Sequence, residues 1–423
     1  MPASGPNILF IVIDDCGYAD LGCTGQTDYR TPALDRLAAE GVRFTQAYAN
    51  SALCTNTRVA LITGRYQYRL PIGLVEPLRW SDRQVSEMGV PPGFPTLPAL
   101  LRGSGYRTAL IGKWHLGYLP RYGPLKSGYD EFFGVMGGFT GYYTHIGDGG
   151  EHDLYEGEVP VERAGYVTDL LSERAAAWVA AASAAPHWPW SAPSVEAAAR
   201  QREVERTELT EGGNTRIYGE MMQSLDAGIG RVLDAVRQRP GDDNTLVVFT
   251  SDNGGERFSK IWPFVGRKFD LLEGGLRVPQ ICCWPGRIEP GCITDQVTIT
   301  MDLTATCLSV AGVAPAPGYP LDGGDLLPVL TGRAAEFERT LYWRMRHRYQ
   351  RAVRRGGWKY LKVADNEYLF DIAYDPRERG DLSKKEPHLL AELRDLWEDW
   401  DRDMLPLPTD AVTPMSNLSA MLW

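Results

Sequence analysis

The chain has 423 residues, of which 43% are hydrophobic and 23% are charged, and its formal net charge is −10. This length suits one large domain and a smaller one, because single cores rarely grow beyond about 250–300 residues. An acidic chain without a long basic run is not expected to bind nucleic acid. No stretch approaches about 18 consecutive apolar residues, so no membrane span is expected.

The N-terminal segment MPASGPNILFIVIDD has neither a basic region nor a small-residue cleavage site. It is typical of a first strand rather than a signal peptide, so we expect a cytoplasmic protein. The seven cysteines are an odd number spread over a long chain, which does not indicate a disulfide framework. Cys282 and Cys283 are adjacent in a strand-like run and are interpreted as small buried hydrophobes on opposite faces.

Three unbroken apolar runs alternate with stretches of helical spacing at 31–41, 93–105 and 217–239. Each run is followed by polar residues: 7–13 by Asp14 and Asp15, 108–111 by Lys113 and His115, and 246–249 by Asp252 and Asn253. The alternation predicts an α/β fold with a large, mostly parallel central sheet flanked by helices. Because parallel strands end at one sheet edge, where ligands bind in such folds, we expect these polar side chains to meet there.

The pattern changes after about residue 335. Residues 340–382 alternate apolar with charged side chains between Gly and Asp-Pro turns, which predicts a small antiparallel sheet. The segment PHLLAELRDLWEDWDRDM then predicts an amphipathic helix packed on that sheet. We therefore expect an α/β domain that carries the site over 1–334, an antiparallel-sheet subdomain over 335–404 and a Pro-rich tail over 405–423.

Oxygen donors predominate among the polar residues at the predicted edge: Asp14, Asp15, Asp252 and Asn253. Hard divalent cations prefer such ligands, so the set favours Ca²⁺, with Mg²⁺ or Mn²⁺ as alternatives. Zinc is not expected, since no His or Cys lies at ligand spacing among them. The Asp14–Asp15 pair alone would be better interpreted as a helix-capping turn.

A second group consists of cationic and histidine side chains: Arg58, Lys113, His115, His187 and Lys268. Arg58 lies one helical turn after Cys54 in the segment SALCTNTRVALITGR (51–65). Together these side chains would hold an anionic ester against the metal, with the histidines as proton donors. A single lysine or arginine is more often a surface residue, and a single histidine is more often a structural one. The interpretation as a binding site therefore depends on all five residues together.

Seven separated segments resemble the sulfatase family of the alkaline phosphatase superfamily. They are NILFIVIDDCGYADLGCTG, TPALDRLAAEGVRFTQAYA, CTNTRVALITGR, GYRTALIGKWHLG, APHWPW, SDNGG and GRKFDLLEGGLRVPQI. The segment EYLFDIAYDPRERGDLS is similar to the family's C-terminal subdomain. The resemblance covers most of the chain and implies a sulfuric ester hydrolase of the arylsulfatase type, acting on a small anionic ester.

The resemblance also implies roles for the residues that match the family's motifs. Cys54 would be converted to formylglycine by a formylglycine-generating maturation enzyme, and the hydrate would attack sulfur. The metal would be held by Asp14, Asp15, Asp252 and Asn253. Arg58 and Lys113 would steady the hydrate, His115 would take a proton as the intermediate breaks down, and His187 and Lys268 would face the leaving oxygen.

The chain departs from the family's pattern in two places. The usual motif is Cys-X-Pro-Ser-Arg or Cys-X-Ala-Ser-Arg, whereas Asn56 and Thr57 occupy its third and fourth positions here. If Cys54 stays unconverted, the protein would bind a metal and a sulfate ester without turnover. The Ala-rich stretch before His187 also lacks the family's apolar strand, so either 179–185 forms a short weak strand or His187 is carried differently.

Another alternative is a phosphonate monoester or phosphodiester hydrolase, because phosphodiesters and sulfate monoesters both carry one negative charge. A nicotinamide cofactor is not expected, since no Gly-rich phosphate loop follows the first strand. Several aromatic or histidine residues would either line the mouth of the site or pack between the domains: Trp80, Tyr142, Tyr143, His145, Trp188, Trp190, Trp343 and His347. The sequence leaves the natural substrate and a homo-oligomer open.

Overall fold

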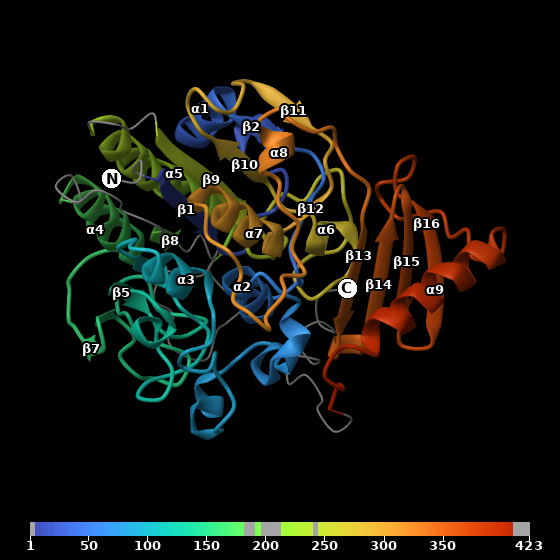
Figure 1. The fold of residues 1–423 in the computed structure, drawn as a ribbon, viewed down its shortest axis with the longest axis horizontal. Coiled ribbons are helices and arrows are strands. Elements are labelled where there is room, and N and C mark those ends of the chain that lie inside the picture. Colours follow the sequence, from blue (N-terminus) through green and yellow to red (C-terminus); the bar gives the residue numbers. More distant parts are fainter. Residues whose placement is uncertain (1–4, 182–190, 196–212, 240–243, 409–423) are drawn as a thin grey trace.

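The computed structural model describes residues 5–181, 191–195, 213–239 and 244–408. A large, mostly parallel sheet with helices on both faces lies beside a smaller antiparallel sheet, which confirms the expected α/β architecture (Figure 1). The seven cysteines are free. No helix in the described ranges is long and apolar enough to cross a bilayer.

The described part of the large sheet has ten strands in the order β11-β2-β10-β9-β1-β8-β4-β5-β6-β7. Its central strands β9, β1, β8, β4 and β5 are parallel, whereas β10, β6 and β7 run antiparallel to their neighbours. The bounds are β1 (Asn7–Ile13), β2 (Val42–Phe44), β4 (Ala109–Lys113), β5 (Glu131–Val135), β6 (Tyr155–Glu156), β7 (Val159–Pro160), β8 (Ser191–Val195), β9 (Thr245–Ser251), β10 (Gln280–Cys283) and β11 (Cys292–Thr294).

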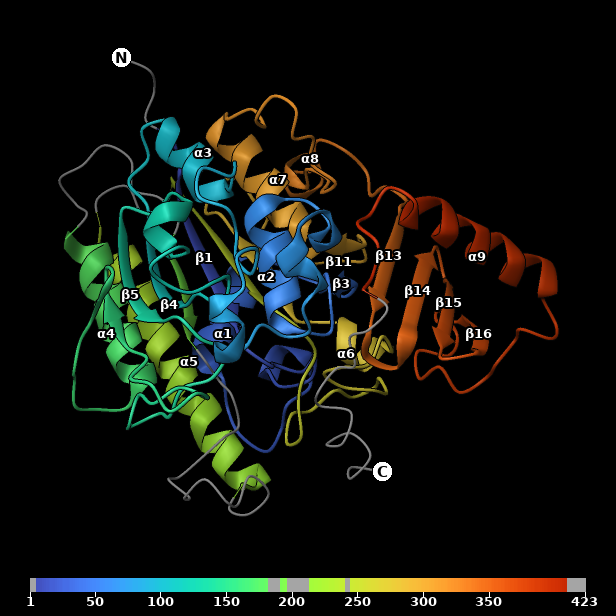
Figure 2. The same cartoon turned by 90° about the horizontal axis from the view of Figure 1, so that it is seen from below.

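The strand β1 is apolar from Ile8 to Ile13 because helices cover both faces of the sheet. Leu9, Ile11 and Ile13 of β1 pack in the cluster that includes α1 (Pro32–Glu40), α4 (Val167–Ala181) and α5 (Thr215–Arg237). The alternate residues of β1 pack in the cluster that includes α2 (Cys54–Thr63), α3 (Leu97–Gly103) and α7 (Thr300–Ala311). Figure 2 shows the sheet between these helices, for example between α7 and α5. Such two-sided burial is what parallel strands require.

Shorter elements connect these layers. A two-stranded parallel pair is formed by β3 (Ala47–Tyr48) and β12 (Thr298–Ile299), and two short helices are α6 (Glu273–Leu276) and α8 (Leu327–Leu330). Single 3₁₀ turns occur at Gly22–Thr24, Gln67–Arg69, Pro71–Leu74, Trp80–Gln84, Pro124–Ser127 and His347–Tyr349.

The antiparallel sheet consists of β13 (Thr340–Met345), β14 (Gln350–Arg355), β15 (Trp358–Val363) and β16 (Asn366–Asp371). The helix α9 (Pro387–Asp401) covers its outer face, where Trp397 packs with Val353 (Figure 1). The inner face packs on the large domain, and Trp343 donates its indole N–H to the carbonyl of Ala49 at 2.9 Å.

A buried carboxylate joins the two parts at the hairpin between β13 and β14. The two oxygens of Glu76 accept hydrogen bonds from the backbone N–H groups of Arg346 at 2.8 Å and His347 at 2.9 Å. The segment around Glu76 is thus fixed by the antiparallel sheet.

The alternative prediction of a short weak strand at 179–185 is wrong for residues 179–181, because Val179 and Ala181 belong to α4. Leu171, Ala175 and Val179 recur at helical spacing and are buried against the sheet, which explains why the helix continues. Residues 182–185 lie outside the described ranges. The strand between β1 and β4 is β8, which comes after His187 in the sequence.

Candidate active site

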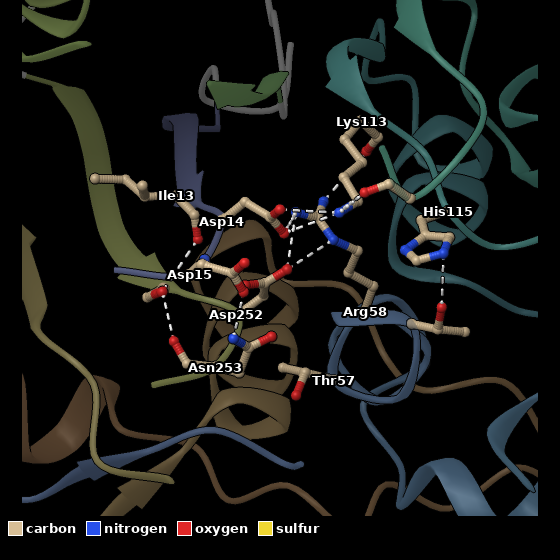
Figure 3. A network of polar contacts seen from close by, with 12 residues as sticks. Ile13, Asp14, Asp15, Thr57, Arg58, Lys113, His115, Asp252 and Asn253 are labelled. Carbon is tan, nitrogen blue, oxygen red and sulfur yellow. Dashed lines mark hydrogen bonds and ion pairs between the residues drawn. The ribbon is translucent and has the colours of Figure 1, made fainter. Parts of the chain in front are cut away.

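The carboxyl ends of β1 and β9 bring three carboxylates together. The two strands pair in register from Asn7 opposite Thr245 to Ile13 opposite Ser251, so the residues that follow them leave the sheet at the same edge. Asp252 accepts a hydrogen bond from the backbone of Asp15 at 3.3 Å, and the Asn253 amide donates to the carboxylate of Asp15 at 2.7 Å (Figure 3). The sheet edge predicted from the sequence therefore gathers these side chains.

Cys54 is the first residue of α2 and is only 3% exposed. Its sulfur and one carboxylate oxygen each of Asp14 and Asp252 all lie within 4.8 Å of one another. Thr57 fixes the chain before the helix, because its hydroxyl donates to the carbonyl of Ser51 at 3.0 Å and accepts from the Ser51 N–H at 3.0 Å. Burial raises the pKa of the Cys54 thiol to about 11, although Lys113 and Lys268 act in the opposite direction.

Arg58 lies one turn further along α2 and connects both acidic strand ends. Its Nε donates to Asp252 at 3.0 Å, its Nη2 donates to Asp14 at 3.2 Å, and its Nη1 donates to the carbonyl of Lys113 at 3.2 Å (Figure 3). The rigid guanidinium fork suits this arrangement of acceptors. Arg58 therefore fixes the helix start relative to the ends of β1, β4 and β9.

Two lysines complete the charge balance of the site. Lys113 ends β4 and contacts both carboxylate oxygens of Asp14 at 3.0 Å, while Lys268 contacts Asp15 at 2.6 Å. With Arg58, three cations thus face the three carboxylates. Burial and the nearby Asp14 raise the pKa of Asp252 well above its ordinary value. The pKa of Asp14 is held well below its ordinary value, because the favourable charges of Lys113 and Arg58 outweigh its burial.

His115 follows the end of β4 and is 1% exposed. Its Nε2 lies 2.9 Å from the carbonyl of Leu78 and 3.1 Å from the hydroxyl of Thr55. Because a carbonyl only accepts, Nε2 carries the hydrogen and Nδ1 presents a lone pair. Burial and the charge of Lys113 lower the pKa of His115 well below its ordinary value, so the imidazole is neutral. In this state His115 is a proton acceptor.

Sequence reasoning missed Gly138, which contacts two of these residues. Its carbonyl accepts a hydrogen bond from Lys113 at 2.9 Å, and a Cβ at this position would lie 2.4 Å from Cε1 of His115. The glycine allows the backbone to lie against the imidazole ring. The only signal in the sequence was the Gly-Gly pair that shortly follows the apolar run of β5.

Asp20 was also missed, and it positions the loop that follows β1. Its carboxylate accepts hydrogen bonds from the N–H groups of Gly17 and Lys260, both at 2.8 Å, and from the hydroxyls of Tyr29 and Tyr218. These contacts join the acidic loop to the segment that leads to Lys268. The many acceptor bonds keep the buried carboxylate satisfied.

The remaining residues named from the sequence are placed differently. His187, Trp188 and Trp190 lie outside the described residues. Four other aromatic or histidine side chains are buried in packing, namely Tyr142, His145, Trp343 and His347, and Trp80 is partly buried against Tyr118. Tyr143, in contrast, is 62% exposed. Packing is thus the better interpretation for Trp343, which contacts Tyr48, and for Tyr142, which stacks on Tyr166.

The donor set fits a hard divalent cation. Asn253 uses its amide nitrogen to bind Asp15, whereas its oxygen is buried and has no hydrogen-bond partner among the described residues. A buried oxygen without a hydrogen-bond partner is costly, and this one belongs to a side chain that contacts the carboxylate of Asp15. Oxygen donors of this kind are the ligands that Ca²⁺ and Mg²⁺ prefer. Of the four predicted ligands, Asp14 and Asp252 lie within 4.8 Å of each other and of Cys54, while Asn253 contacts Asp15.

Comparison with known proteins gives consistent matches. The family model "Sulfatase" matches residues 6–313, and the model "N-sulphoglucosamine sulphohydrolase, C-terminal" matches residues 263–399. N-acetylgalactosamine-6-sulfatase of Sus scrofa is 34% identical over 78% of this chain and 67% of its own length. Arylsulfatase A of Homo sapiens is 31% identical over 92% of this chain and 82% of its own. The crystal structure of Ps i-CgsB in complex with k-i-k-neocarrahexaose has a TM-score of 0.85 at 29% identity, covering 99% of this chain and 97% of that chain.

Proposed function

Because this chain belongs to the sulfatase family and is a sulfuric ester hydrolase, we propose that it cleaves sulfate esters at the sheet edge where Cys54 meets Asp14 and Asp252. The observation that carries the proposal is the placement of the Cys54 sulfur within 4.8 Å of both carboxylates. A helix start, two acidic strand ends and the cations Arg58 and Lys113 enclose this point. A monoanionic ester would find both charge neutralisation and a nucleophile there.

The nucleophile is proposed to be formylglycine, made from Cys54 by a maturation enzyme. A thiol whose pKa is raised to about 11 is protonated at neutral pH and is a weak nucleophile. Attack by sulfur would also leave a stable thiosulfate ester. The hydrated aldehyde supplies one hydroxyl for attack and a second for release of sulfate.

Asp14, Asp15, Asp252 and Asn253 would hold a divalent cation, for which Ca²⁺ is the best fit. When bound, the ion supplies Lewis acidity toward the ester and lowers the pKa of a neighbouring hydroxyl. A cation on Asp15 would compete with Lys268, whose amine contacts that carboxylate at 2.6 Å. Lys268 would then turn toward the ester and its leaving oxygen.

His115 is proposed to accept the proton released as the covalent intermediate breaks down. Its Nε2–H is fixed by Leu78, so its Nδ1 lone pair is the basic atom. The lowered pKa keeps this atom unprotonated at neutral pH. His187 remains the proposed acid for the leaving oxygen.

Two named relatives support a sulfated sugar as the substrate. One is N-acetylgalactosamine-6-sulfatase, and the solved structure of Ps i-CgsB contains a neocarrahexaose. We propose that this enzyme likewise removes sulfate from a saccharide.

Mass spectrometry of the tryptic peptide Phe44–Arg58 tests the proposed nucleophile. The aldehyde is expected in protein that turns over an aryl sulfate, and parallel rates on an aryl phosphodiester would establish the preference for sulfur. Full turnover by protein that carries only the thiol would overturn the formylglycine proposal. A thiol without turnover would instead support a binding protein.

A further inference from the structure

A second pocket lies where the large domain meets the antiparallel sheet. It has a volume of about 700 Å³. The large domain contributes Gln46, Phe264, Arg277 and Asp295 to its wall, and the antiparallel sheet contributes Arg354 of β14 together with Gly357. This volume is within the range of about 300–1,000 Å³ that is usual for small-molecule sites.

This junction pocket is separate from the site described above. None of the residues that surround Cys54 lines it. The strand β14 begins near the active site, where Gln350 donates to the carbonyl of Phe269 at 2.8 Å. Arg354 is four residues further along, about 13 Å away at the rise of an extended strand.

Three guanidinium groups line the junction pocket, and two of them have a carboxylate partner. Arg277 contacts Glu273 at 3.1 Å, and Arg339 forms an ion pair with Asp302. These two arginines are therefore neutralised within the protein.

Arg354 is the third arginine and has no ion-pair partner among the described residues. It is 3% exposed, and its Nη2 donates to the neutral side chain of Gln46. Its Nε and Nη1 have no hydrogen-bond partner among the described residues. The nearby carboxylate of Glu273 is taken up by Tyr48, Arg277 and Lys359. A buried cation with unmade hydrogen bonds favours an anionic ligand.

The other lining residues indicate what carries the anion. The ring of Phe337, which is 38% exposed, offers an apolar surface, whereas the exposed carboxylates of Asp295, Glu336 and Glu338 offer acceptors for hydroxyl groups. A sugar ring that bears one acidic group matches these three features. Its acidic group would meet the buried guanidinium of Arg354, its apolar face would meet the aromatic ring, and its hydroxyl groups would meet the exposed carboxylates.

We propose that the junction pocket is a second binding site for an anionic saccharide, with the sulfate or carboxylate of one sugar unit on the guanidinium of Arg354. The choice of a saccharide rests on the proposed function, whereas the preference for an anion rests on Arg354 alone. Such a site would retain a sulfated polymer at the enzyme while the active site acts on another unit.

Calorimetric titration of the full-length Cys54→Ala protein tests this site without turnover. The ligands are N-acetylgalactosamine 6-sulfate, glucuronate and neutral N-acetylgalactosamine, and binding of the two anionic sugars is expected to exceed that of the neutral one. Gln46→Glu places a carboxylate beside Arg354 and should weaken glucuronate binding at least about tenfold, because the cation is then satisfied internally and this sugar carries no sulfate for the active site. Arg354→Gln should have the same effect.

The matched control is Arg355→Gln, since Arg355 lies on the opposite face of β14 and pairs with Glu392 of α9. This control is expected to bind like the parent. Unchanged affinity for glucuronate in Gln46→Glu, or binding of the neutral sugar as tight as that of glucuronate, would overturn the proposal. If Arg354→Gln fails to fold, Gln46→Glu decides the question.

Turnover of a small aryl sulfate separates this inference from the proposed function. Gln46→Glu made in the chain that retains Cys54 should leave that rate unchanged, because the aryl ester does not reach the junction pocket. A chain without any sulfatase activity could still bind anionic sugars there, so failure of one proposal is distinct from failure of the other.

Discussion

The side-chain amine of Lys113 lies 3.0 Å from both carboxylate oxygens of Asp14, and neither residue is more than 2% exposed. This pair joins the end of β4 to the end of β1 across β8, which lies between them in the sheet. It shows that the site is built as a balanced charge cluster and that each charge depends on its partners.

Replacing Lys113 by Met should reduce the free energy of unfolding by about 3–5 kcal/mol, because the buried carboxylate of Asp14 then keeps only Arg58 as a cationic partner. Calcium should restore part of this loss, since the ion would replace the missing positive charge. Urea unfolding with and without calcium measures both effects. The control is Lys126→Met, which removes a half-exposed pair with Glu158 and should change stability by less than about 1 kcal/mol. Equal losses in the two variants would contradict the cluster.

Calcium should raise the melting temperature of the unmodified protein, and a chelator should lower it. The stabilisation should approach about 2.7 kcal/mol when the free ion is at 100 times its dissociation constant. Asn253→Ala should diminish this shift by removing the buried amide oxygen, whereas Asn366→Ala at the exposed start of β16 should not. A melting temperature that is the same in calcium and in chelator would argue against the metal.

Cys54→Ala should abolish turnover and leave the fold intact, because the side chain that attacks sulfur is removed from a position that tolerates a small residue. Circular dichroism and aryl sulfate hydrolysis measure the two properties. Cys307→Ala is the control, since Cys307 is buried in α7 among apolar residues and away from the charged cluster. Retained activity in Cys54→Ala would disprove the assigned nucleophile.

Gly138→Ala should lower kcat on the order of 100-fold, because the added methyl group would displace the imidazole of His115 and cost much of its proton-transfer contribution. The melting temperature should change little, which would show that the loss of kcat does not come from unfolding. Gly103→Ala serves as the control, since a Cβ there meets no other atom within 4 Å. If Gly138→Ala keeps normal kcat, the proposed role of His115 loses its main support.

The carboxyl of Glu378 should make stability depend on pH. Burial raises the pKa of Glu378 to about 7 from an ordinary value of 4.5, even though its partner Lys359 acts in the opposite direction. The folded state therefore binds a proton more tightly than the unfolded state, and the resulting stability is present below pH 4.5 and lost as pH rises through 7. Unfolding measured at pH 5, 6.5 and 8 should show a shallower decline in Glu378→Gln than in the parent.

The exposed Glu386→Gln is the control for this effect and should follow the parent at every pH. Parallel curves for all three proteins would mean that Glu378 does not titrate in this range. The neighbouring Glu273 has the opposite sign, because Lys359 and Arg277 overcome its burial and lower its pKa to about 2. Its stabilising effect is present above pH 4.5 and is lost only as pH falls toward 2.

The sequence predicted the sheet and its acidic edge because strand runs are local patterns and parallel strands share an edge. Asp14 and Asp252 are far apart in the chain, yet both directly follow strands, β1 and β9, that pair side by side from their first residue to their last. Gly138 and Leu78 were not predictable, since their contacts with His115 depend on loops whose paths no local pattern specifies.

The alternation of residues in β14 predicted an antiparallel sheet but could not show what each face contacts. Arg351 and Arg355 face α9, whereas Arg354 faces the large domain and the junction pocket. Which arginine lacks a carboxylate partner depends on the docking of two parts of the chain, and so it is visible only in three dimensions.

The contact of Glu76 with the β13–β14 hairpin limits how this enzyme can be re-engineered. Glu76 is two residues from Leu78, whose carbonyl sets the tautomer of His115. The small sheet is therefore not an interchangeable module that can be grafted from another member of the family. In a chimaera, the β13–β14 hairpin that contacts Glu76 would come from another protein. The position of the Leu78 carbonyl, and with it the basicity of His115, would then have to be restored by further substitutions.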